Sequence, residues 1–172
     1  MKRGKKGAAE VALFGMFVAL AMLMSYVETL LPLSLGIPGV KPGLANLVTM
    51  VCLYALGGVA AGAVSLTRIM LTGYTFGNMS AALYSMAGGG LSLLCMILAR
   101  RSGRFEKTGV SIIGGVAHNV GQLAVAALVV ENAAVFWYLP VLLLAGAITG
   151  TAIGLLSGEV LRRLPPSVLR KH

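Results

Sequence analysis

Long apolar stretches, separated by short polar segments or by segments rich in glycine and proline, fill almost the whole chain. The first stretch runs from residue 8 to residue 31. At the helical rise of about 1.5 Å per residue it is long enough to cross a bilayer. A basic segment before an apolar run is also typical of a signal peptide, but the hydrophobic part of a signal peptide is shorter. We therefore predict an uncleaved first transmembrane helix.

Helix-breaking residues divide the remaining apolar stretches. Two prolines and three glycines in residues 33–43 are incompatible with a regular helix. The block from residue 44 to residue 71 is too long for one comfortable span and is interrupted at Gly57 and Gly58, so we predict two helices within it. The pattern predicts a single transmembrane domain over residues 1–172, with six helices at residues 8–31, 44–56, 59–72, 79–99, 110–130 and 134–161.

The composition supports a membrane protein. Hydrophobic residues make up 58% of the chain and charged residues only 11%, whereas a soluble domain carries roughly 25% charged residues. If a chain this apolar folded as a soluble protein, it would expose large hydrophobic patches to water. We therefore predict an all-α integral membrane protein with the lipid bilayer as its surroundings. Cys52 and Cys95 lie inside apolar stretches without any metal-binding spacing, so no metal site is predicted.

The distribution of positive charge predicts the topology. Only Lys41 and Arg68 of the 14 basic residues lie outside three clusters. Basic residues favour cytoplasmic loops, and six helices place all three clusters and both termini in the cytoplasm. The net charge of +9 does not indicate nucleic-acid binding, because the clusters are short, lie between long apolar stretches and form no groove with interleaved aromatic residues. The clusters are Lys2, Arg3, Lys5 and Lys6; Arg100, Arg101, Arg104 and Lys107; and Arg162, Arg163, Arg170 and Lys171.

Glycines spaced by four residues indicate close packing of the predicted helices. Gly146, Gly150 and Gly154 lie on one face of the last helix. Ridges of small residues let helix backbones approach closely in lipid. We interpret these glycines as packing positions.

Polar residues inside the apolar segments are the candidate functional residues, because polar groups are costly in a membrane. His118 and Gln122 are four residues apart and share one helix face. A set with net positive charge suits an anionic or carbonyl-bearing ligand, and apolar walls suit a ligand that is partly apolar. The candidate ligand-binding residues are Lys41, Asn46, Arg68, His118, Asn119 and Gln122.

A structural interpretation of the same residues stays open. Arg68 could simply pair with Glu28, and Asn119 and Gln122 could hold neighbouring helices together. For the set as a whole we favour a ligand site, since this number of polar groups is an expensive way to join helices.

The sequence offers little for conventional catalysis. It contains no aspartate and none of the P-loop, GxSxG or HExxH patterns. We predict that the chain is not an enzyme and that it cannot hydrolyse ATP on its own. The sequence does not identify a cofactor.

Four segments resemble the Gx transporter family, which is also described as heptaprenyl diphosphate synthase component I. They are PGVKPGLANLVT (residues 38–49), SMAGGGLSLLCM (85–96), GGVAHNVGQLAVA (114–126) and YLPVLLLAGAITG (138–150). Pro42 departs from the family's usual bulky apolar residue, but Lys41 and Asn46 are present.

That family is similar to the S components of energy-coupling-factor transporters. The resemblance implies an S-component-like bundle that binds a vitamin-like ligand from the outer side. It also implies that the first helix docks on a transmembrane coupling protein with ATPases. Relatives also occur in quinone- and flavin-linked membrane complexes. The docking role falls on a stripe of small residues, Ala8, Ala12, Gly15 and Ala19.

Three functions remain as hypotheses for a protein of the bacterial plasma membrane. The leading one is the substrate-binding component of a transporter for a vitamin, quinone or isoprenoid precursor. The second is an accessory subunit of isoprenoid-quinone synthesis or of flavin and quinone electron transfer, and the third is a structural anchor. Prenyl chain elongation needs aspartate-rich motifs that hold Mg²⁺, so any role of this chain in a prenyl diphosphate synthase would be non-catalytic.

Overall fold

The computed structural model describes residues 2–30, 43–76, 79–165 and 168, with side chains from residue 10 onward. These residues form helices, turns and short connections and contain no strand, which confirms the all-α prediction. The elements are α1 (Lys2–Leu30), α2 (Leu44–Ala55), α3 (Gly58–Thr75), α4 (Met79–Arg101), α5 (Lys107–Val130), the 3-10 helix η1 (Ala133–Tyr138) and α6 (Leu139–Arg163).

The predicted interruption near Gly57 is present in the structure. α2 ends at Ala55, and Gly57 has a φ of 95° directly before α3 begins. Glycine adopts this positive φ without the steric cost that a side chain would bring. The apolar block of residues 44–71 is therefore two helices joined by a very short connection.

Several helices extend beyond their apolar segments. α1 begins at Lys2 rather than at residue 8, and α5 begins at Lys107 rather than at residue 110. Lysine and arginine are good helix formers, so the end of an apolar run marks the edge of the hydrocarbon region and not the end of the helix.

Between α5 and α6, Glu131 has a φ of 52°, and the Asn132 side chain accepts a hydrogen bond from the Ala134 amide at 2.8 Å.

Four helices are long and apolar enough to cross a membrane: residues 10–30, 79–101, 107–130 and 133–163. α2 is apolar but has only 12 residues, about 18 Å of helix, which is shorter than the hydrocarbon core of roughly 30 Å. α3 has 18 residues and carries Arg68. The six-span topology therefore remains a prediction.

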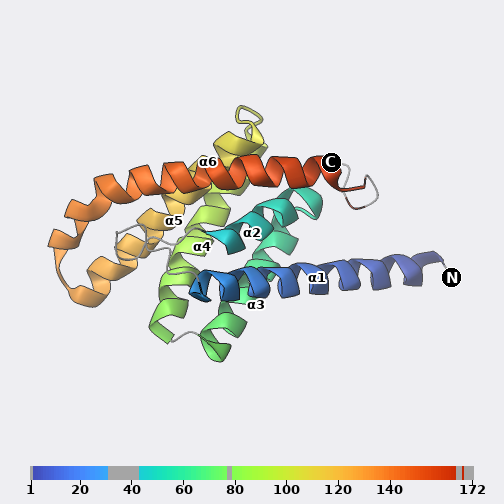
Figure 1. The fold of residues 1–172 in the computed structure, drawn as a ribbon, viewed down its shortest axis with the longest axis horizontal. Coiled ribbons are helices and arrows are strands. Elements are labelled where there is room, and N and C mark those ends of the chain that lie inside the picture. The colour runs from blue at the N-terminus through green and yellow to red at the C-terminus, as the bar shows by residue number, and fades with distance from the viewer. Residues whose placement is uncertain (1, 31–42, 77–78, 166–167, 169–172) are drawn as a thin grey trace.

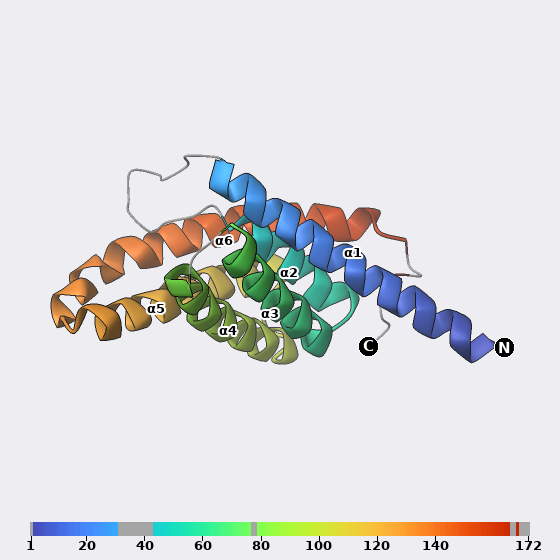
Figure 2. The same ribbon diagram turned by 90° about the horizontal axis from the view of Figure 1, so that it is seen from below.

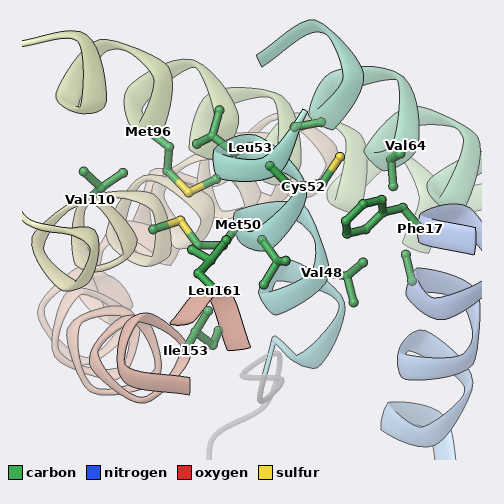
Figure 3. Packing of buried hydrophobic residues seen from close by; sticks show 14 of the residues in the cluster. Phe17, Val48, Met50, Cys52, Leu53, Val64, Met96, Val110, Ile153 and Leu161 are labelled. Atoms are coloured by element: carbon green, nitrogen blue, oxygen red, sulfur yellow. The ribbon is translucent and has the colours of Figure 1, made fainter. Parts of the chain in front are cut away.

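α2 lies at the centre of the bundle, which explains how a short helix fits there. Met50, Cys52 and Leu53 of α2 are almost completely inaccessible, and they pack with side chains from all five other α-helices. Figure 3 shows Phe17 of α1 on one side of α2 and Ile153 of α6 on the other. Because α2 is surrounded by protein, lipid thickness does not set its length.

Glycines bring the backbones of α5 and α6 into contact. A Cβ atom at Gly150 would lie 2.7 Å from Ile112 Cα, and one at Gly154 would lie 2.7 Å from Thr108 Cα. At Gly146 it would lie 2.8 Å from the Gly115 carbonyl oxygen. The three glycines are packing positions, as predicted, and α5 and α6 form the long hairpin that Figure 1 shows.

Several basic residues gather at one end of the molecule. α1 begins and α6 ends at this end (Figure 2). Arg100 of α4 reaches the end of α2, where it donates a hydrogen bond to the Leu53 carbonyl and lies 4.6 Å from the centre of the Tyr54 ring. Tyr54, Lys107 and Arg162 line a common cavity there, so the ends of α2 and α6 and the start of α5 meet. We call this the basic end.

The six-helix topology predicts where reporter tags will be found. Tags at residue 103 and at both termini should report the cytoplasm, and tags at residues 36 and 132 should report the outside, because basic loops are retained in the cytoplasm. Paired reporters that are active only outside or only inside would measure this in intact cells. An outside signal at residue 103 would contradict the six-helix topology.

Candidate functional site

A cavity of about 370 Å³ lies between the helices, lined by residues of all six α-helices. Its volume is at the lower end of the roughly 300–1,000 Å³ that is usual for small-molecule sites. The end of α1 and the start of α2 line it, which places it away from the basic end. Its polar and charged lining residues are Ser25, Glu28, Thr29, Asn46, Arg68, Thr72, Ser85, His118, Asn119, Gln122 and Thr149.

The cavity brings together five of the six candidate ligand-binding residues, namely Asn46, Arg68, His118, Asn119 and Gln122. They come from α2, α3 and α5, so residues far apart in the sequence face one space. Lys41 lies outside the described residues. Ligand binding by this set stays a prediction. Because five of its members line one cavity, the prediction now names the place where a ligand would bind.

Arg68 is the most costly residue of the cavity to bury. Its side chain comes from α3 and is 7% exposed. Its Nη1 atom donates a hydrogen bond to Ser25 Oγ of α1 at 3.3 Å, while its Nε atom is buried without a hydrogen-bond partner. A buried donor without a partner costs free energy that an acceptor would recover. Arg68 lines the cavity, so its guanidinium suits a carboxylate or carbonyl oxygen there.

Glu28 connects the end of α1 to the start of α2. Its Oε1 atom accepts a hydrogen bond from the Leu44 amide. The residue before the helix, Gly43, has a φ of 77° and no capping side chain, so Glu28 satisfies an amide that the helix itself leaves unpaired. The charge of Glu28 also acts on Arg68. Glu28 and Arg68 line the same cavity, and the pairing of the two residues stays a prediction.

The polar residues of α5 have mixed surroundings. Asn119 Nδ2 donates to the Leu142 carbonyl of α6 at 2.7 Å, which is the helix-joining role that the structural interpretation gave it. Gly88 of α4 allows a close approach, since a Cβ atom there would lie 2.8 Å from both Gln122 Cγ and the His118 carbonyl oxygen. Gln122 is therefore the better probe of a ligand role, because Asn119 also joins two helices.

Hydroxyl residues were missing from the candidate set. Ser25 contacts Arg68 directly, and Thr72 and Thr149 line the cavity while donating to carbonyls of their own helices. The spacing of Thr72 four residues after Arg68 could have identified it, since such residues share a helix face. With these residues the cavity wall is more polar than the sequence analysis predicted.

The candidate docking stripe on α1 faces away from the bundle. Ala12, Gly15 and Ala19 are exposed, and nothing lies within 4 Å of a Cβ atom added at Gly15. Phe17 and Ala21 of the same helix are buried against the core. The side chain of Ala8 lies outside the described residues. Ala12, Gly15 and Ala19 are thus not used for packing within the part of the chain that the structure describes.

The basic end holds a second cavity, of about 650 Å³. Its charged residues are Glu106, Lys107, Glu159 and Arg162, and Arg162 lies 3.9 Å from Glu159. With two acidic and two basic residues among the described ones, this space has no clear preference for a charged ligand. Among the residues that the structure describes, no group of His, Cys, Asp and Glu could hold a metal ion.

Comparison with known proteins gives one match. Residues 17–160 match the family model described as heptaprenyl diphosphate synthase component I. The matched region contains all four segments that carry the resemblance. The match confirms the resemblance to heptaprenyl diphosphate synthase component I, while the resemblance to Gx transporters stays a prediction. No curated protein and no solved structure matches the chain. The similarity to S components of energy-coupling-factor transporters stays a prediction.

Proposed function

The chain belongs to the heptaprenyl diphosphate synthase component I family, and from that premise we propose that it is the substrate-binding component of a membrane transporter. It would lie in the bacterial plasma membrane and bind a small anionic or carbonyl-bearing ligand in the cavity around Arg68. Four helices of membrane-spanning length and the apolar composition support the membrane location.

The observation that carries this proposal is the buried guanidinium of Arg68, which lines a cavity together with residues from all six α-helices. A residue that served only to join helices would use its donors on neighbouring helices, as Asn119 does. Arg68 instead keeps a buried Nε atom without a partner beside amide and hydroxyl side chains. Intramembrane charged residues of this kind commonly mark binding sites or transport routes.

The exposed stripe on α1 supports a partner for transport. An isolated chain without a nucleotide-binding motif needs an external source of energy, and the resemblance to S components implies a coupling protein with ATPases. Ala12, Gly15 and Ala19 form a smooth surface that no other described part of the chain covers. Small residues of this kind allow another helix to approach closely.

The family description supports a second candidate, a non-catalytic accessory subunit of isoprenoid-quinone synthesis or of flavin and quinone electron transfer. The words "component I" imply at least one further component. The chain contains no aspartate, so it lacks the residues that hold Mg²⁺ on a diphosphate in prenyl chain elongation. In that case the chain would anchor or present a substrate for the other component.

Replacing Gln122 by leucine tests the ligand site. Gln122→Leu keeps a similar volume and removes the amide, so a ligand group that it binds would lose a hydrogen bond and be left unpaired. The loss is about 1–3 kcal/mol, and we expect roughly tenfold less co-purified ligand, measured by mass spectrometry of protein extracted with its native lipids. Thr151→Val removes a hydroxyl of α6 that does not line the cavity and should retain the ligand.

Equal ligand retention by Gln122→Leu and wild type, with equal thermal unfolding temperatures, would assign the α5 amide to packing alone. The absence of any retained small molecule from wild-type protein would argue against the binding function itself.

A bulky residue on α1 tests the docking stripe. Gly15→Leu should prevent co-purification with the transmembrane coupling protein and leave ligand retention unchanged, because the stripe faces away from the cavity. Gly90→Leu is the matched control, since Gly90 of α4 is also exposed and also has open space around its Cβ position. If Gly15→Leu still co-purifies with a coupling protein that binds wild type, the stripe is not the docking surface.

A further inference from the structure

We propose that Glu28 determines which ligands the cavity accepts, by limiting it to compact polar molecules that are neutral or singly negative and excluding prenyl diphosphates. This inference rests on the proposed function, because it takes the cavity to be a ligand site. It adds a specificity residue and a substrate class to that site.

The charges of the cavity are nearly balanced. The described residues that line the cavity include a single Lys or Arg side chain, Arg68, and a single Asp or Glu side chain, Glu28. Both side chains line the same cavity. A diphosphate carries more than one negative charge. The cavity would not supply enough positive charge to balance it, and unbalanced charge is costly in a buried position.

Hydrogen bonds hold both charged groups in place. Glu28 Oε1 accepts from the Leu44 amide, so moving the carboxylate away would leave the first turn of α2 without this partner. Ser25 Oγ accepts from Arg68 Nη1 at 3.3 Å. A ligand therefore meets a carboxylate and a guanidinium in fixed positions, with Arg68 Nε as the unused donor. That arrangement suits a ligand with one acceptor oxygen at Arg68 and little further negative charge.

The size and polarity of the cavity also argue against a prenyl chain. A volume of about 370 Å³ suits a compact molecule. The larger apolar side chains that line it are Phe76 and Ile153, while hydroxyl, amide and imidazole groups form most of the remaining wall. A hydrocarbon chain would displace water from the polar groups of this wall and offer them no hydrogen bond in return. A polar heterocycle or a small carboxylate would use them.

The substitution Glu28→Gln separates the charge from the hydrogen bond. The glutamine side chain keeps an oxygen that can accept from the Leu44 amide and removes the negative charge. Glu131→Gln is the matched control, because Glu131 follows α5, is exposed and does not line the cavity. Inorganic diphosphate and farnesyl diphosphate serve as probes, and calorimetry of wild type and both variants in nanodiscs measures their affinities.

We expect Glu28→Gln to bind inorganic diphosphate at least tenfold more tightly than wild type, which corresponds to about 1.4 kcal/mol. Glu131→Gln should match wild type. Farnesyl diphosphate should bind wild type no more tightly than inorganic diphosphate does, a comparison that needs no variant. Equal diphosphate affinities of Glu28→Gln and wild type, or tighter binding of farnesyl diphosphate to wild type, would overturn the inference. If either of these results were found while wild-type protein still retained its native ligand, the specificity inference would be wrong and the proposed binding function would remain supported.

Discussion

Burial of one guanidinium in an apolar helical bundle is the constraint on which the candidate site depends. Arg68 is 7% exposed, and a buried charge requires compensation by hydrogen bonds and opposite charge. Ser25 supplies a hydrogen bond and Glu28 supplies the charge, both from α1. The same α1 segment also satisfies the first amide of α2. The cost of burying Arg68 is therefore met in part by residues that also fix how α1 joins the bundle, while Nε has no hydrogen-bond partner.

Glycine contacts create the remaining wall of the cavity. Backbone contact at Gly150 joins α5 closely to α6, and the close approach at Gly88 brings α4 against His118 and Gln122. Close packing in lipid relies on such contacts because the hydrophobic effect does not drive apolar helices together there. The bundle is thus tight where glycines meet and open where Arg68 and the amides face one another. The tight helix contacts and the cavity both depend on where the small residues lie.

The sequence predicted the helices well because its breaker residues act locally. The interruption at Gly57 follows from a positive φ that glycine accommodates. Convergence of Arg68 with His118 could be proposed from the cost of polar groups in a membrane. The contribution of Ser25 could not be predicted, because its contact with Arg68 depends on how α1 packs against α3. Helix ends beyond the apolar segments were also missed, since hydrophobicity marks the membrane region and not the helix.

The central claim is that a compact ligand binds in the cavity beside Arg68. An experimental density map of the protein, extracted and kept in its native lipids, tests it most directly. We predict density for a compact molecule with an acceptor atom within hydrogen-bonding distance, roughly 2.7–3.2 Å, of the Arg68 guanidinium. Arg68 Nε bonded to a protein side chain in a closed cavity, or a cavity that holds only water, would contradict the account.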